Sequence, residues 1–73
     1  WSVVLFNDEI NRFDDVIRAI MEAIHCSEEV GEHIAMAAHN NGKAMVTTGD
    51  RERVDEVASV LRAYKLTVEI QKV

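Results

Sequence analysis

The chain has 73 residues, of which 48% are hydrophobic and 29% are charged, and its formal net charge is −5. This composition predicts a single small globular domain over residues 1–73. It argues against nucleic acid as a partner, because phosphate contacts depend on clustered Lys and Arg. No apolar run approaches the ~20 residues that cross a bilayer, so we expect a soluble, cytoplasmic monomer with no membrane partner. Cys26 is the only cysteine, which excludes an internal disulfide and fits a reducing compartment.

The first half of the chain predicts one strand and two helices. Residues 1–6 are β-branched and aromatic, which favours a buried strand, although a start at Trp1 instead of Met leads us to expect a fragment of a longer protein. In residues 13–24, apolar side chains recur at three- and four-residue spacing, which predicts an amphipathic helix. Ser27 is a typical N-cap for a second helix, which should run to about His39 before residues 40–42 stop it.

The second half predicts a strand, a helix and a strand. Residues 43–48 form the second expected strand, and residues 48–50 the turn and cap of a third helix with an apolar stripe from Val54 to Tyr64. Apolar and polar residues alternate over 66–71, which predicts a half-exposed strand. The order is βααβαβ, so we expect an α+β fold: a two-layer sandwich in which a three-stranded antiparallel sheet carries helices on one face.

Hydrogen-bond acceptors follow the first predicted strand directly, in the sequence Asn7-Asp8-Glu9. If the backbone stays extended, side chains two residues apart share a face, and an apolar floor continues into a row of acceptors. The residues of that face are Leu5, Asn7, Glu9, Asn11 and Phe13.

A second face lies on the second predicted helix, where Ala35, Ala38 and His39 stand at i, i+3 and i+4. If it meets the acceptor row, a carboxamide, a carboxylate and an imidazole converge over an apolar hollow. The hollow would be lined by Phe13, Val16, Ala35 and Ala38. Three methionines, Met21, Met36 and Met45, are expected to fill the core.

Two motifs together resemble those of the ClpS family, the adaptors of the bacterial Clp protease. The sequence Asn7-Asp8-Glu9 after an apolar strand is similar to the family's Asn-Asp-acidic motif. Residues 39–44, His-Asn-Asn-Gly-Lys-Ala, are similar to its His-x-x-Gly-Lys-Ala motif. The resemblance covers essentially the whole chain, with the same order of elements and compatible spacing.

This resemblance implies that the chain binds N-degrons, which are proteins with a free N-terminus that begin with Phe, Tyr, Trp or Leu. It also implies that the substrate is handed to the N-terminal domain of a Clp unfoldase. The implied contacts to the α-amino group come from Asn7, Glu9 and His39, with Asp8 beside them. The implied hydrophobic pocket consists of Leu5, Asn11, Phe13, Val16, Ala35, Ala38 and Leu66.

The chain departs from the common family pattern at three places. Glu9 stands where the family often has Asp, so its carboxylate reaches farther. Asn11 and Arg12 replace a frequent Thr-Pro pair, which removes the rigidity of proline. Ala35 replaces a bulky residue that is often Met, which enlarges the hollow and leads us to expect weaker selectivity against β-branched first residues.

Simpler interpretations of the same residues remain. Taken alone, Asn7-Asp8-Glu9 is typical of a solvated connection and His39 of a helix C-terminus. The zinc-binding residue types present are His25, Cys26, His33 and His39. Adjacent helix residues diverge and positions six apart do not share a face, so these four do not predict a metal site.

The alternative function is a protein docking module that resembles the C-terminal domain of the bacterial ribosomal stalk protein, which has a closely related βααβαβ architecture. That domain lacks the Asn-Asp-acidic loop, so the adaptor is preferred. An enzyme is not expected, because the acid-base cluster has neither a nucleophile nor a phosphate-binding loop. No cofactor is expected.

Overall fold

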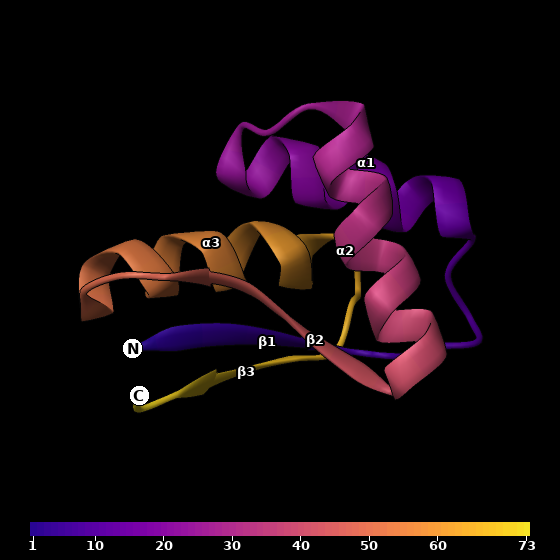
Figure 1. The fold of residues 1–73 in the computed structure, drawn as a ribbon. Helices are drawn as coiled ribbons and strands as arrows, with labels where there is room; N and C mark the ends of the chain where they lie inside the picture. Colours follow the sequence, from indigo (N-terminus) through magenta and orange to yellow (C-terminus); the bar gives the residue numbers. More distant parts are fainter.

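Three strands and three helices follow one another in the order βααβαβ, and the computed structural model describes all of residues 1–73 (Figure 1). This order confirms the fold predicted from the sequence. The elements are β1 (Ser2–Phe6), α1 (Phe13–Ile24), α2 (Glu28–Asn41), β2 (Lys43–Thr48), α3 (Arg51–Ala63) and β3 (Val68–Gln71).

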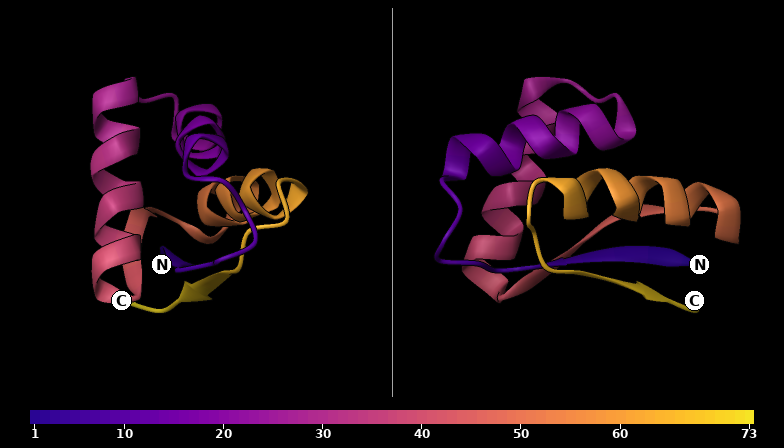
Figure 2. Two further views of the ribbon diagram at one scale, coloured as in Figure 1. Left: turned by 90° about the vertical axis from the view of Figure 1, so that its right-hand side faces the viewer. Right: turned by 180° about the vertical axis from the view of Figure 1, so that it is seen from behind.

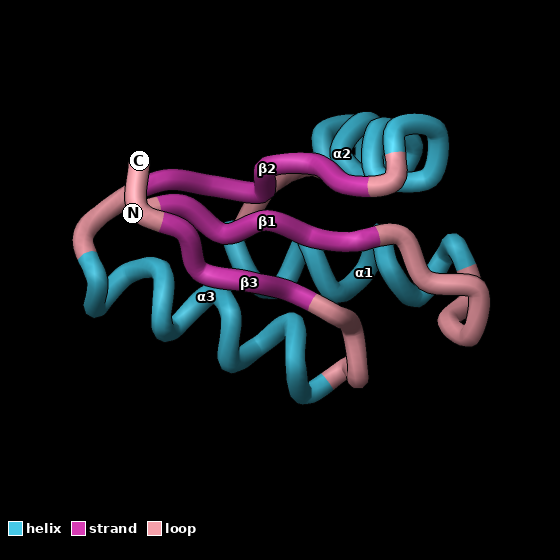
Figure 3. Tube along the Cα trace, turned by 90° about the horizontal axis from the view of Figure 1, so that it is seen from below, coloured by secondary structure: helices cyan, strands magenta, loops and turns pink.

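The sheet is antiparallel, with β1 between β2 and β3. The side chains of Val3 and Leu5 on β1 are fully buried and face the helices. The pairing with β2 steps from Val3–Thr47 to Val4–Met45, so Val46 is an extra, buried residue that forms a β-bulge. All three helices lie on one side of the sheet, and the other side is uncovered (Figure 3).

The helices pack on the sheet unequally. α3 lies on β1 and β3, α2 runs beside β2, and α1 rests on α2 and α3 farther from the strands (Figure 2). The apolar spacing seen in the sequence explains this packing, because each helix turns its stripe inward. The largest fully buried side chains come from β1 and from the two helices α1 and α3: Leu5, Ile20, Leu61, Val3, Val54 and Val57.

The helix ends follow the capping chemistry of the sequence. The Ser27 hydroxyl accepts a hydrogen bond from the Val30 N–H at 3.2 Å, and the Asp50 carboxylate accepts one from the Arg53 N–H at 2.9 Å. α2 continues to Asn41 instead of ending near His39, because Gly42 is the one residue of the 40–42 stop that adopts the left-handed conformation, with φ 87°.

Two smaller expectations differ from the structure. The last strand begins at Val68 and not at Leu66, because the chain is still turning at Lys65, which has a φ of 64°. Two of the three methionines assigned to the core, Met36 and Met45, are 42% and 59% exposed. No helix is both long and apolar enough to span a membrane.

Gly31 allows the close approach of α2 to α1. A Cβ atom there would lie 3.2 Å from the Ile17 carbonyl oxygen and 3.2 Å from Met21 Cγ. The carbonyl belongs to a helix backbone and cannot turn aside, so Gly31→Val is expected to lower the free energy of unfolding by about 1–3 kcal/mol. Urea denaturation would measure this loss. Ser59→Val on the exposed face of α3 is the control, and an equal loss in both variants would contradict the close-packing explanation.

Candidate functional site

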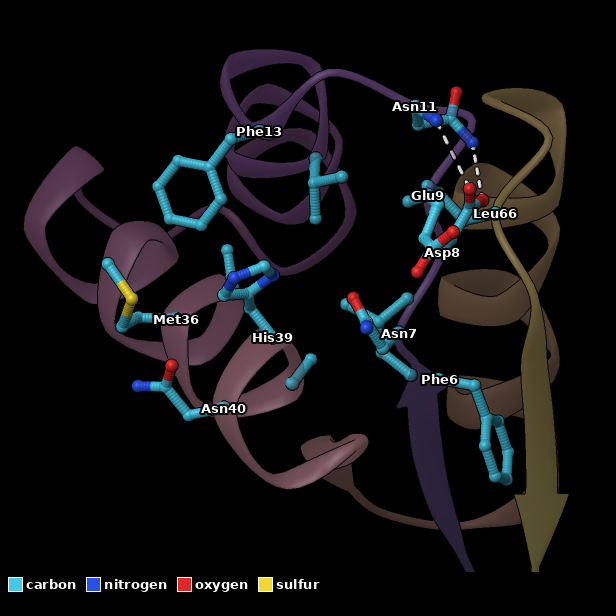
Figure 4. A pocket seen from close by; sticks show the side chains of 14 residues that line it. Phe6, Asn7, Asp8, Glu9, Asn11, Phe13, Met36, His39, Asn40 and Leu66 are labelled. Atoms are coloured by element: carbon cyan, nitrogen blue, oxygen red, sulfur yellow. Dashed lines mark hydrogen bonds between the residues drawn. The ribbon is translucent and has the colours of Figure 1, made fainter.

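A hollow of about 670 Å³ opens between the end of β1, the start of α1 and the C-terminal half of α2 (Figure 4). Every residue that the sequence assigned to the site lines this hollow. They are Leu5, Asn7, Asp8, Glu9, Asn11, Phe13, Val16, Ala35, Ala38, His39 and Leu66.

Backbone pairing brings the two halves of the site together. The Asn7 N–H donates to the Gly42 carbonyl at 2.8 Å, so β1 and β2 stay paired one residue beyond their ends. The Gly42 N–H in turn donates to the Ala38 carbonyl at 2.9 Å and closes α2. Asn7 is therefore held beside the last turns of the helix that carries His39.

The base of the hollow is apolar, and its residues are buried. Leu5, Ala35, Ala38 and Leu66 are all at most 5% exposed. Both alanines lie on α2, and their short side chains leave space where a longer side chain would project. Phe13, the first residue of α1, is 37% exposed and lies at the rim.

The loop after β1 does not continue as an extended segment, so the assumption behind the alternating row of acceptors is wrong beyond Asp8. The chain bends over residues 9–11. The cause is the Asp8 carboxylate, whose Oδ1 accepts hydrogen bonds from the Ile10 N–H at 2.6 Å and the Asn11 N–H at 3.1 Å. Such side-chain bonds to the local backbone compete with an extended conformation.

The same hydrogen bonds stabilise the charged form of Asp8. The N–H of Ile10, the carboxamide of Asn11 and then the N–H of Asn11 hold the pKa of the Asp8 carboxyl below its usual value, against a small opposing effect of burial. Because the pKa is depressed in the folded protein, the stabilisation is complete above the unfolded pKa of ~3.9 and is lost as the pH falls through the folded value. Asp8 is therefore an ionised acceptor at neutral pH.

The other three acceptors are free. None of the side-chain hydrogen bonds or ion pairs of the chain involves the side chain of Asn7, Glu9 or His39. Asn7 and Glu9 lie on one side of the hollow and His39 on the other (Figure 4). All three are exposed, so water satisfies them until a ligand arrives. The arrangement suits a hydrogen-bond donor with an apolar group attached.

Three residues at the hollow were not predicted: Phe6, Met36 and Asn40. Met36 and Asn40 stand four residues apart on α2, so the helical spacing that linked Ala35 to His39 could have found them. The Phe6 side chain points away from the hollow (Figure 4), so it was not recognisable as part of the site.

Comparisons with known proteins bear on this geometry. Residues 1–69 match the family model of the ATP-dependent Clp protease adaptor protein ClpS. The ClpS adapter protein of Mycobacterium tuberculosis is 28% identical over 72 residues, which cover 99% of this chain and 71% of that protein. The ClpS of Streptomyces coelicolor is 24% identical, with 99% and 75% covered.

Two further matches extend the comparison. Mouse E3 ubiquitin-protein ligase UBR2 is 28% identical over 58 residues, and the match spans 80% of this chain but only 3% of the ligase. A structure of Agrobacterium tumefaciens ClpS2 bound to L-phenylalaninamide superimposes with a TM-score of 0.81, at 24% identity, over 93% of this chain and 92% of that one. This likeness shows the fold. Because the family model matches residues 1–69 of its 73 residues, the chain belongs to the ClpS family of Clp protease adaptors.

Proposed function

We propose that the chain recognises N-degrons, binding a free α-amino group together with a bulky hydrophobic first side chain, and passes them to a Clp protease. One observation carries this proposal. Three acceptors without partners, Asn7, Glu9 and His39, surround the mouth of a hollow with an apolar base. The resemblance to the ClpS family implied amine contacts from the same three residues.

The acceptors match an α-ammonium group in number and charge. The ammonium has three N–H donors, while the Asn7 amide oxygen, a Glu9 carboxylate oxygen and an unprotonated His39 ring nitrogen are acceptors. Bonds between an ammonium and a carboxylate are short and roughly twice as strong as neutral ones. An acetylated or internal residue has no such cation, so the site distinguishes a free terminus.

The hollow matches a large apolar side chain. Full burial of a Phe or Leu side chain contributes about 1.5–3 kcal/mol, which the apolar base can supply. First residues Phe, Tyr, Trp and Leu are the expected ligands. The ligand of the similar ClpS2 structure, L-phenylalaninamide, has the same two features, a free α-amino group and a phenyl side chain.

Delivery completes the proposal. The acceptors and the apolar hollow bind a ligand without making or breaking a covalent bond. The proposed role is therefore that of an adaptor and not of an enzyme. Family membership supports a Clp unfoldase N-terminal domain as the second partner. No group of three His, Cys, Asp or Glu side chains is gathered that could hold a metal ion.

Fluorescence anisotropy of labelled peptides tests recognition directly. Peptides that begin with Phe, Leu, Trp or Tyr are expected to bind with a free N-terminus and to lose binding when acetylated, because acetylation removes the cation. His39→Ala is expected to weaken binding by about tenfold or more, the effect of losing one hydrogen bond to a charged group.

His33→Ala is the matched control, since His33 is exposed on the same helix but outside the hollow. The affinity of this variant for the peptides should equal that of the unaltered protein. Equal binding of free and acetylated peptides would refute amine recognition. Absence of binding to every free terminus would refute the proposed function as a whole.

Ala35 is expected to set the tolerance for branched first residues. A β-branched side chain such as Ile or Val is wide next to its backbone, and the buried methyl of Ala35 leaves room for that width. Ala35→Met should fill this space and weaken binding of peptides that begin with Ile or Val by about tenfold, as overpacking does. Binding of Leu peptides should change less.

The same anisotropy assay measures the effect, with Ala63→Met on the exposed end of α3 as the control. If peptides that begin with Ile or Val bind the unaltered protein no more tightly than they bind the Ala35→Met variant, the wider hollow does not relax selectivity.

A further inference from the structure

Asp8 lies at the hollow, but its carboxylate is directed into its own loop. Oδ1 accepts from the backbone N–H groups of Ile10 and Asn11, and Oδ2 accepts from Asn11 Nδ2 at 2.6 Å. These bonds close the loop into a turn (Figure 4). The contrast with Asn7 and Glu9, which have no such partners, separates a structural acceptor from two free ones.

Asn11 extends this turn to a distant part of the chain. Its Nδ2 also donates to the Lys65 carbonyl oxygen at 3.2 Å, across 54 residues of sequence. One carboxamide thus ties the loop to the turn between α3 and β3. It is the single side-chain hydrogen bond from the loop to another element.

The Lys65 carbonyl is a well-held anchor. Lys65 has a φ of 64°, a conformation that costs a residue with a Cβ about 1 kcal/mol or more. The Lys65 N–H donates to the Arg62 carbonyl at 2.8 Å, and the Leu66 N–H donates to the Leu61 carbonyl at 3.3 Å. Leu66 itself is buried at the base of the hollow. The anchor therefore belongs to the same unit as the pocket floor.

The free acceptors depend on this arrangement for their positions. At one end the loop is held by the Asn7 N–H bond to Gly42, and at the other it enters α1, where the Arg12 carbonyl accepts from the N–H groups of Asp15 and Val16. Between these two ends, the loop is held by the side-chain bonds of Asp8 and Asn11. Glu9 lies between the two fixed ends and contributes no bond of its own. Without the bonds of Asp8 and Asn11, the middle of the loop must be ordered when the ligand binds, and that ordering reduces affinity.

We propose that Asn11 is a positioning residue, which joins Asp8 to the Lys65 carbonyl and so holds the amine-binding loop in register with the pocket floor. The inference rests on the proposed function of the site. It assigns Asp8 and Asn11 to the support of the acceptors, and leaves amine binding to Asn7, Glu9 and His39.

Asn11→Asp is the sharpest test, because it keeps the size of the side chain and replaces the donor with an oxygen. That oxygen would face the Asp8 carboxylate and the Lys65 carbonyl, so both bonds are lost. Asn11→Ala removes the same bonds without the added repulsion. Asn41→Ala is the matched control, since Asn41 is exposed at the end of α2 and outside the hollow.

Two measurements at neutral pH are made on each variant. Amide hydrogen exchange in the ligand-free protein should become about tenfold faster at Ile10 and Asn11, the effect of losing hydrogen bonds to a charged group. Affinity for free-terminus peptides that begin with Phe, Leu or Trp should fall about tenfold in both Asn11 variants. The ratios among the three peptides should stay constant, because the pocket floor is unchanged.

Each other outcome overturns the proposal in a recognisable way. Unchanged exchange would show that the bonds do not hold the loop. Faster exchange with unchanged affinity would show that the loop need not be held. A loss confined to one peptide would make Asn11 a wall of the pocket. Failure of the unaltered protein to bind any free terminus would refute the proposed function. The exchange data would then still show whether Asn11 holds the turn in the ligand-free protein.

Discussion

The hydrogen bond from the Asn7 N–H to the Gly42 carbonyl is the constraint on which the site depends. This bond extends the pairing of β1 with β2 by one residue, to Asn7. Its acceptor, Gly42, is also the C-cap of α2. Two motifs 32 residues apart in sequence meet because one follows a strand and the other precedes its partner strand. The left-handed conformation of Gly42, with φ 87°, makes the tight passage from helix to strand possible. His39 is carried to the hollow by the same turn.

The acceptors of the site divide into two groups with different energetics. Asp8 uses its carboxylate within its own loop, where it accepts three hydrogen bonds. Asn7, Glu9 and His39 stay exposed, so they incur no penalty for burial without a partner in the free protein. In the proposed function, a ligand replaces their water and adds an apolar side chain that the hollow covers. The cost of ordering is met largely during folding, which leaves more of the interaction energy for binding.

Much of this arrangement could be predicted from the sequence, because it depends on local signals. Helical spacing, the caps at Ser27 and Asp50, and strand alternation each act within a few residues. The site residues were predicted mainly from the resemblance to the ClpS family, and all of them line one hollow. The helix face of Ala35, Ala38 and His39 supports that prediction from spacing alone. The bend after Asp8 could not be predicted, because a side chain that folds back on its own loop competes with extended backbone by a small margin. The bond from Asn11 to Lys65 joins residues 54 apart, and no local pattern specifies it.

The hollow itself is a stability cost that the rest of the core must offset. A chain of 73 residues hides only ~60% of the surface that its unfolded form exposes, so each missing contact matters. Ala35 and Ala38 forgo packing that larger side chains would provide, and an empty apolar space loses dispersion contacts on one side. The compensation lies on the inward face of α3, where Val54, Val57 and Leu61 are fully buried and the helix packs against α1, β1 and β3. These three side chains of α3 do not line the hollow, so the hollow can stay open while this part of the core remains packed.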